Sequence, residues 1–197
     1  MKLKYKLGLY LTLLLGVMHT SEAQTYTVDT LESRLEWKGR KVTGSHNGIL
    51  MIKSGELVIA DGQLTGGNFE MDMTTIRVLD LSNRNMNEKL LNHLKSEDFF
   101  SVEEYPTSTF VITSATPGDA NAYSITGDLS IKGTTAPVTF DATVDIADSN
   151  TTATATIKYD RTVYDIQYGS GSFFSNLGDN MINEEIELTV TLKAINK

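Results

Sequence analysis

Apolar and polar residues alternate along several segments of the chain. The clearest examples run over 138–146 and 186–193, where every second residue is apolar and the residues between are Thr, Asp, Glu or Lys. A period of two is typical of antiparallel strands with one buried face and one wet face. The same alternation occurs over 69–73, 125–129 and 153–159. The pattern therefore predicts a protein built mainly from β-strands.

Short turn signals separate these apolar runs. Asp61-Gly62 lies between two of them and is typical of a tight hairpin turn. Pro117-Gly118-Asp119 and Lys132-Gly133 are further turn sequences. Many short strands joined in this way indicate a β-sandwich or a β-barrel.

Only one segment has a convincing helical period. Its apolar arc consists of Met86, Leu90, Leu91 and Leu94. Asn85 is the predicted N-cap, with Glu88 three residues later completing a capping box. Ser96 is expected to cap a further short turn, after which Phe99 and Phe100 present two large rings before the next strand. A single amphipathic helix in a β-protein has to cover something, and we expect it to close one end of the sheet as a lid.

The first 23 residues have the features of a secretory signal peptide. Lys2, Lys4 and Lys6 precede an apolar run over 7–18, and Ser21-Glu22-Ala23 supplies small residues at a cleavage site. Roughly a dozen apolar residues are too few to cross a bilayer, which needs about 20. We therefore expect an exported protein, periplasmic or secreted, whose mature chain is one domain over residues 24–197.

Composition and charge narrow the classes of partner. The chain has no Cys and a net charge of −8. Without residues 1–23, which hold three Lys and one Glu, the net charge becomes −10. Such a surface repels nucleic acid, so no nucleic-acid partner is expected. Without a Cys there is no acceptor for lipid attachment at the cleavage site, and no stable membrane anchor is expected.

Several distinctive motifs follow one another along the chain. The segment over 90–110, LLNHLKSEDFFSVEEYPTSTF, combines a leucine-bearing helix with S-x-D-F-F and Y-P before a strand that ends in Phe. The segment over 125–138 reads ITGDLSIKGTTAPV. Further motifs are Tyr26-Thr27-Val28-Asp29, the strand over 33–37, the turn over 44–48 and the closing strand over 184–193. In this order the motifs closely resemble the YceI-like family of lipid-binding proteins, and the segment over 125–138 resembles the hairpin of that family.

The resemblance implies an all-β fold, namely an extended lipocalin-like antiparallel β-barrel of about eight strands with one short helical lid. It also implies non-covalent binding of a long-chain isoprenoid or another amphipathic lipid, for carriage or buffering outside the cytoplasm. No cofactor is expected, although a bound polyisoprenoid or quinone would be the ligand. If the barrel is hollow, its predicted lining is Trp37, Phe69, Met71, Leu94, Phe99, Phe110, Ile125, Leu129 and Phe140. Ordinary core packing explains each of these residues equally well.

The chain departs from the family pattern in several places. Gly44-Ser45-His46 replaces a Gly-x-aromatic sequence, and the first strand holds a single aromatic residue, Trp37, so the resemblance leaves the lining at that end open. The polar residues Asn83-Arg84-Asn85 are inserted before the helix, and the loop over 170–180 carries Phe173 and Phe174 at its centre. The insertion and the loop are expected to reshape the mouth of a cavity.

Candidate chemistry is sparse. His46 and His93 are the histidines that remain after signal removal, and neither lies in a ligand-spaced cluster. The sequence has no Gly-x-Ser-x-Gly nucleophile motif. A lipid-binding protein that is not an enzyme is the main hypothesis. The alternatives are a stress-related structural or interaction protein with a filled core and, less favoured, a hydrolase or metal-binding protein that uses His46 or His93. The sequence also leaves a homodimer open.

Overall fold

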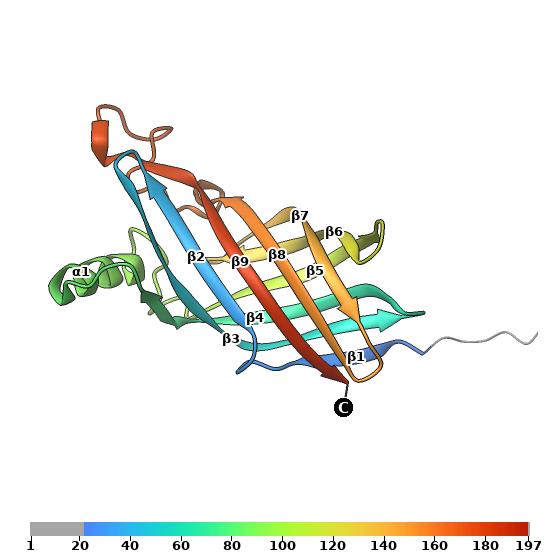
Figure 1. The fold of residues 1–197 in the computed structure, drawn as a ribbon. Helices are drawn as coiled ribbons and strands as arrows, with labels where there is room; N and C mark the ends of the chain where they lie inside the picture. Colours follow the sequence, from blue (N-terminus) through green and yellow to red (C-terminus); the bar gives the residue numbers. More distant parts are fainter. Residues whose placement is uncertain (1–21, 197) are drawn as a thin grey trace, which may run out of the picture.

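The computed structural model describes residues 22–196, which form one β-rich unit with a single α-helix (Figure 1). The predicted signal peptide lies outside the described residues except for its last two positions. The strands are β1 (Gln24–Val28), β2 (Arg34–Lys41), β3 (Gly44–Ala60), β4 (Gln63–Val78), β5 (Thr107–Pro117), β6 (Ala122–Ile131), β7 (Thr134–Ile146), β8 (Asn150–Asp160) and β9 (Ile182–Asn196). The helix is α1 (Arg84–Lys95), and two short 3₁₀ turns are η1 (Arg161–Tyr164) and η2 (Gly178–Asn180).

The nine strands close into an antiparallel barrel with eight strand positions. From β2 to β9 each strand pairs with the next, and β2 pairs with β9 to close the ring. β1 occupies no position of its own, because it pairs with the same two neighbours as β2, farther along them. β1 and β2 therefore lie end to end between β3 and β9. The predicted lipocalin-like barrel of about eight strands is confirmed.

Strand register explains the alternating sequence pattern. β8 and β9 pair Ala155 with Val190 and Ile157 with Leu188, so the apolar members of both strands face the same side of the sheet. Their polar neighbours face outward, as Thr156 does. The period-two segments are thus strands with one face directed into the barrel.

The two ends of the barrel differ in how their strands are connected. At one end, called the far end, three short turns over 61–62, 118–121 and 147–149 join the strands. At the other end, called the near end, two short turns lie beside two long connections, over 79–106 and 161–181. Figure 1 shows α1 and the connection that precedes β9 at this same end. Asp61 and Gly62 have φ values of 52° and 72°, which confirms the predicted tight turn.

Helix α1 begins two residues earlier than the sequence pattern predicts. Asn83 is the N-cap, and its side chain accepts a hydrogen bond from the Met86 backbone N–H at 3.1 Å. The predicted cap Asn85 was wrong, because it already lies inside the helix. Glu88 instead pairs with Arg84 at 2.8 Å. Met86, expected on the apolar arc, is 59% exposed, since the helix buries only its C-terminal turn against the barrel.

Ser96 does not cap a following turn in the predicted way. Its hydroxyl donates backward to the His93 carbonyl oxygen at 2.8 Å, and its backbone N–H bonds to the same oxygen. Ser96 therefore ends α1. The chain then turns tightly through Phe99, whose ring is buried, before β5 begins.

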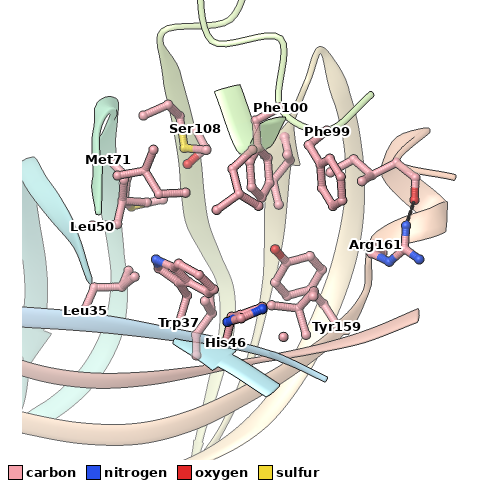
Figure 2. A pocket seen from close by; sticks show the side chains of 18 of the residues that line it. Leu35, Trp37, His46, Leu50, Met71, Phe99, Phe100, Ser108, Tyr159 and Arg161 are labelled. Carbon is pink, nitrogen blue, oxygen red and sulfur yellow. Dashed lines mark hydrogen bonds between the residues drawn. The ribbon is translucent and has the colours of Figure 1, made fainter. Parts of the chain in front are cut away.

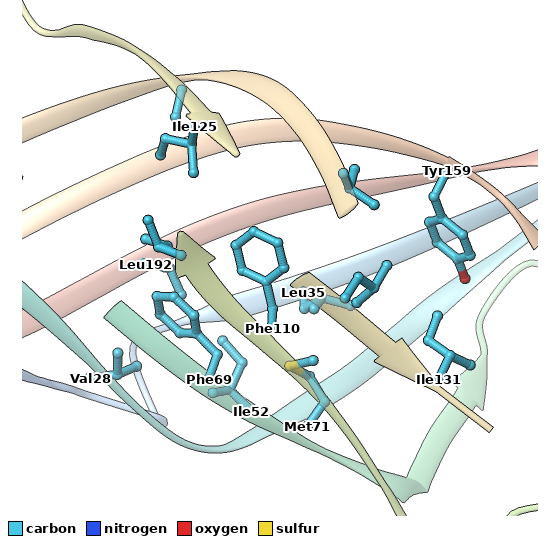
Figure 3. Close-up of a cluster of buried hydrophobic side chains, with 14 of the residues drawn as sticks. Val28, Leu35, Ile52, Phe69, Met71, Phe110, Ile125, Ile131, Tyr159 and Leu192 are labelled. Atoms are coloured by element: carbon cyan, nitrogen blue, oxygen red, sulfur yellow. The ribbon is translucent and has the colours of Figure 1, made fainter. Parts of the chain in front are cut away.

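Large apolar side chains from all sides of the barrel meet inside it (Figure 3). Phe69 and Phe110 stack with ring centroids 6.4 Å apart, and Phe110 also contacts Phe140. Gly127 makes this arrangement feasible, because a Cβ atom there would lie 2.3 Å from the Phe110 ring. A glycine between Ile125 and Leu129 thus gives space to a neighbouring aromatic ring.

Candidate ligand-binding cavity

The barrel interior is not filled. It holds two adjoining cavities of about 140 Å³ and about 90 Å³, called here the near lobe and the far lobe after the end each approaches. Leu35, Met71, Leu129 and Leu188 line both lobes. These four side chains form the constriction between them.

The far lobe is almost wholly apolar. Its walls come from the eight strands β2 to β9, and Thr154 is its one polar lining residue. The remaining lining is Leu35, Ile52, Leu57, Leu64, Phe69, Met71, Phe110, Ile112, Ile125, Leu129, Val138, Phe140, Ala142, Val144, Ala153, Ala155, Ile157, Leu188, Val190 and Leu192. Such a surface offers hydrophobic contact and no fixed hydrogen-bonding partner.

The near lobe combines an apolar wall with a polar side (Figure 2). α1 and the turn after it supply Leu90, Leu94, Phe99 and Phe100, which cover the lobe from the helix side. The polar side chains at this lobe are Arg40, Lys41, His46, Ser108, Tyr159 and Arg161. No Asp or Glu lines either lobe, although the protein as a whole is acidic. The near lobe therefore favours a neutral or negatively charged polar group.

All nine residues predicted to line a cavity do lie at one. The near lobe contains Trp37, Leu94 and Phe99, and the far lobe contains Phe69, Phe110, Ile125 and Phe140. Met71 and Leu129 are at both. The structure places these side chains, while their role in ligand binding stays a prediction.

Tyr159 is the most informative lining residue absent from the predicted set. Its side chain is 8% exposed, and its hydroxyl makes no hydrogen bond with any residue from 22 to 196. Figure 2 shows its ring across the near lobe from Phe99 and Phe100, with the hydroxyl oxygen directed toward them. Burial raises the pKa of Tyr159, and Tyr164 adds to this effect while Arg161 opposes it. The phenol therefore stays protonated at neutral pH and can donate a hydrogen bond. The alternation of Ile157 and Tyr159 along β8 was a signal that it points inward.

Arg161 holds the chain beside the cavity. Only 1% of it is exposed, and its guanidinium donates to the carbonyl oxygens of Ile166, Asn183 and Ile182 at 2.6, 3.0 and 3.1 Å. Burial lowers the pKa of Arg161, while Glu184 and Asp160 oppose that effect. The guanidinium remains charged at neutral pH. Sequence analysis missed this residue, because its partners are backbone groups brought together only by the fold.

Both candidate histidines form acid–histidine pairs. His46 Nδ1 lies 2.7 Å from Asp80 Oδ2, and His93 Nε2 lies 3.1 Å from Asp98 Oδ2. Burial acts to raise the pKa of Asp80, but hydrogen bonds from the Asn47 N–H and the His46 ring outweigh it and lower the pKa. Within the described part of the chain, no Ser hydroxyl bonds to either ring and no three His, Asp or Glu side chains gather as metal ligands. The hydrolase and metal hypotheses therefore have only these pairs as support.

A closed antiparallel barrel with an apolar interior defines the protein as a lipocalin-like barrel. The sequence model of the YceI-like domain matches residues 26–194. This chain belongs to the YceI-like family, as the motifs of the helix–turn segment and of the β6–β7 hairpin indicated.

Curated relatives match parts of the chain. A UPF0312 protein of Staphylococcus aureus strain MRSA252 is 32% identical over 121 residues, which cover 59% of this chain and 63% of that protein. A UPF0312 protein of Pseudomonas putida strain F1 is 50% identical over 52 residues, covering 26% of this chain and 27% of that protein. The chain thus spans less than two thirds of the relatives that it matches.

Solved structures resemble the whole barrel. Burkholderia cenocepacia BcnA has a TM-score of 0.68 at 20% identity, covering 85% of this chain and 99% of that chain. A polyisoprenoid binding domain from Saccharophagus degradans has a TM-score of 0.66 at 11% identity, covering 88% and 99%. At these identities the likeness establishes the fold. Among the residues described, no helix is both long and apolar enough to span a bilayer.

Proposed function

We propose that this protein binds one amphipathic lipid, an isoprenoid or a molecule of similar shape, inside the barrel and carries or buffers it outside the cytoplasm. The observation that carries the proposal is the two-lobed cavity, whose far lobe is almost wholly apolar and whose near lobe has a polar side. The solved polyisoprenoid binding domain with the same fold supports it. Export is supported by the signal-peptide features of residues 1–23.

The cavity gives the ligand an orientation. The tail lies in the far lobe, where only apolar walls meet it, and the polar headgroup lies in the near lobe. Tyr159 donates a hydrogen bond to the headgroup, because its hydroxyl has no partner among the residues described and burial keeps it protonated. A headgroup oxygen in the near lobe can accept this bond.

The lobes are small for a long chain. An apolar cavity of about 150 Å³ holds one benzene molecule, so each lobe at its present size takes only a short segment of a tail. A longer chain has to displace the constriction between the lobes and the helical lid. Met71 suits the first movement because its unbranched side chain changes rotamer easily. Leu94 and the turn after α1 would move in the second.

Energetics favour exchange over permanent storage. Burial of each CH₂ group stabilises a lipid against water by about 0.8 kcal/mol. A bilayer offers the same gain, and ordering the tail in the barrel opposes binding. The net preference for the protein over a membrane is therefore small. This balance suits a carrier or a buffer.

Native mass spectrometry of protein purified without detergent tests the proposal. We expect a co-purifying lipid, and a thermal shift when polyprenols or quinones are added to stripped protein. Leu129→Arg should abolish occupancy, because it places a charge at the constriction. Ala155→Phe, which fills the far lobe without adding charge, should exclude long tails while the barrel stays folded.

Val111→Arg is the matched control, since Val111 is 45% exposed on the outer face of β5. It should leave occupancy unchanged. Absence of any lipid together with absence of a thermal shift would exclude lipid binding. Unchanged occupancy in Leu129→Arg and Ala155→Phe would show that the lipid lies elsewhere.

We further propose that binding occurs without catalysis. The carboxylate partners of His46 and His93 are not accompanied by a bonded nucleophile in the described residues. Replacing each histidine by alanine should therefore leave the mass of a bound lipid unchanged over time. Slow conversion of the lipid by wild-type protein, lost in either variant, would contradict this.

A further inference from the structure

Exposed apolar side chains concentrate on one connection of the barrel. Of the eleven large apolar residues that are exposed in the described chain, five lie between β8 and β9, namely Val163, Tyr168, Phe173, Phe174 and Met181. Val42, in the β2–β3 turn, is 55% exposed, and its backbone N–H donates to the Met181 carbonyl oxygen at 3.2 Å. We name Val42, Phe173, Phe174 and Met181 the apolar rim. Exposed apolar groups gathered in this way mark an interaction surface.

The rim is held in a fixed shape. The Ser170 hydroxyl, which is fully buried, donates to Glu184 Oε1 at 2.5 Å. The backbone N–H groups of Phe173 and Phe174 both donate to the Ser170 carbonyl oxygen, at 3.3 and 3.0 Å. Hydrogen bonds from Ser170 and Ser172 lower the pKa of Glu184, so this carboxylate stays ionised at neutral pH. Each of the two rings is still 49% exposed. The loop presents them to solvent and does not fold them inward.

The rim has little charge on an acidic protein. Asp179 is the single charged residue over 166–181, and exposed Lys41 lies in the neighbouring hairpin. The whole chain has a net charge of −8. Anionic surfaces repel such a protein. A nearly neutral apolar rim is complementary to a surface of zwitterionic headgroups, into which aromatic rings insert.

The rim lies where the cavity approaches the surface. Lys41 and Ile182, which flank it in sequence, line the near lobe. In the same connection, the Tyr168 ring contacts His93 of α1 and Phe99, with centroids 4.5 and 5.6 Å apart. The same end of the barrel in Figure 1 carries this loop and the β2–β3 turn. The rim is therefore continuous with the mouth and the lid of the cavity.

We propose that the apolar rim docks the protein onto a zwitterionic lipid bilayer, with Phe173 and Phe174 inserted at the headgroup level. Docking places the near lobe against the membrane, so a lipid passes between bilayer and barrel without crossing water. The role in lipid exchange rests on the proposed function. The docking itself is a separate property of the surface.

Flotation with phosphatidylcholine vesicles tests the docking. The chain starting at Gln24 is used beside the full chain, because the apolar run over 7–18 would itself bind lipid, and thermal unfolding checks that the shorter chain is folded. We expect Phe173→Ser/Phe174→Ser to lower the vesicle partition coefficient about ten-fold, since two exposed rings no longer insert. The matched control is Leu31→Ser/Val111→Ser, which removes exposed apolar groups outside the rim and should change partitioning less than about two-fold.

Vesicle composition gives a second readout. Replacing part of the phosphatidylcholine by phosphatidylglycerol should weaken binding at low salt, because the protein is acidic, and added salt should restore it. Failure of the wild-type chain to float, or an equal loss in the control pair, would overturn the proposal. Self-association that depends on the two Phe residues, without flotation, would assign the rim to a second copy of the chain.

Native mass spectrometry of the same variants separates the two proposals. Lipid occupancy without flotation contradicts docking alone. Flotation by a protein that never holds a lipid contradicts the proposed function alone. If both hold, Phe173→Ser/Phe174→Ser slows lipid transfer from vesicles while equilibrium occupancy is kept.

Discussion

The two ends of the barrel are built from the same strands but differ in packing. At the far end, the Tyr26 hydroxyl donates to the Ala147 carbonyl oxygen at 3.1 Å and the Tyr123 hydroxyl accepts from the Leu64 N–H at 3.3 Å. Ala194 and Thr151 are fully buried there. At the near end, a buried Arg and an unbonded phenol line a cavity, and exposed rings lie on the connection beside it. Short turns draw strand ends together, whereas the long connections leave space that side chains only partly fill.

The barrel combines stability at one end with access at the other. The far end closes the apolar far lobe with short turns, and the near end supplies the polar side of the near lobe, the lid and the apolar rim. Regions that move or bind are drawn from the less tightly packed parts of a protein. Substitutions at the far end should therefore lower the free energy of unfolding more than substitutions at the near end. Arg161 is the exception.

Arg161→Met should give the largest loss of stability. It leaves three carbonyl oxygens without their charged donor, and we expect the free energy of unfolding to fall by about 3 kcal/mol. Urea unfolding measures it. Arg40→Met is the control, because Arg40 pairs with Glu187 at the partly exposed surface and such pairs contribute about 0–1 kcal/mol. An equal loss of unfolding free energy in Arg161→Met and Arg40→Met would show that the near end has no tightly held element.

A pair of core truncations tests the contrast between the ends directly. Ile59 is buried near the far end and is 4% exposed. Ile59→Ala should lower the free energy of unfolding by about 3 kcal/mol. Leu90 lies on the partly buried face of α1 beside the near lobe. Leu90→Ala should lower the free energy of unfolding by about 1 kcal/mol. Hydrogen exchange should then be faster in the lid than in β3. A reversed order of costs would contradict the comparison.

Tyr159→Phe should have the smallest effect on stability and a clear effect on binding. At neutral pH the unfolding free energy should change by less than about 1 kcal/mol, since the hydroxyl has no partner among the described residues. Lipid occupancy should fall if the hydroxyl binds the headgroup. Tyr164→Phe is the matched control, because Tyr164 does not line the cavity.

The dependence of unfolding free energy on pH above neutrality gives Tyr159→Phe a second test. Burial raises the pKa of Tyr159 above its ordinary value of 10.0, so the stability that the neutral phenol contributes is complete below pH 10 and is lost as pH rises toward the raised pKa. At pH 11 wild-type protein should lose about 1 kcal/mol through this residue. Tyr159→Phe should not show that part of the loss. Identical alkaline unfolding would indicate that the phenol is already solvated.

Much of the fold could be predicted from sequence because strand periodicity is local information. The alternation over 138–146 and 186–193 identified β7 and β9, and Asp61-Gly62 identified a turn with positive φ. The helix was found but its N-cap was misplaced, because Asn83 and Asn85 are both good caps and only the backbone path selects one. Family resemblance, not periodicity, separated barrel from sandwich.

Some residues of the site could likewise be predicted from local sequence, and others could not. The nine predicted lining residues are large apolar groups on predicted strands or on the lid, and alternation assigns such residues to the inner face. Tyr159 could have been added by the same reasoning. Arg161 could not, because the carbonyl groups it binds lie up to 22 residues away in the chain. Glu184 bonds Ser170 from the opposite side of a loop, and nothing local predicts that contact.

The sequence by itself determined the strand-rich class, the turns, the lid helix and the inward-facing residues, since each follows from spacing over a few positions. Tertiary structure alone decided that β1 and β2 share one position of the ring, that the interior keeps two lobes, and that the rim residues from two connections meet at the near end. The physical reason is that closure and packing depend on pairs of groups far apart in the chain. The space left inside the barrel depends on how all of these groups pack together, and no short segment of the sequence encodes that packing.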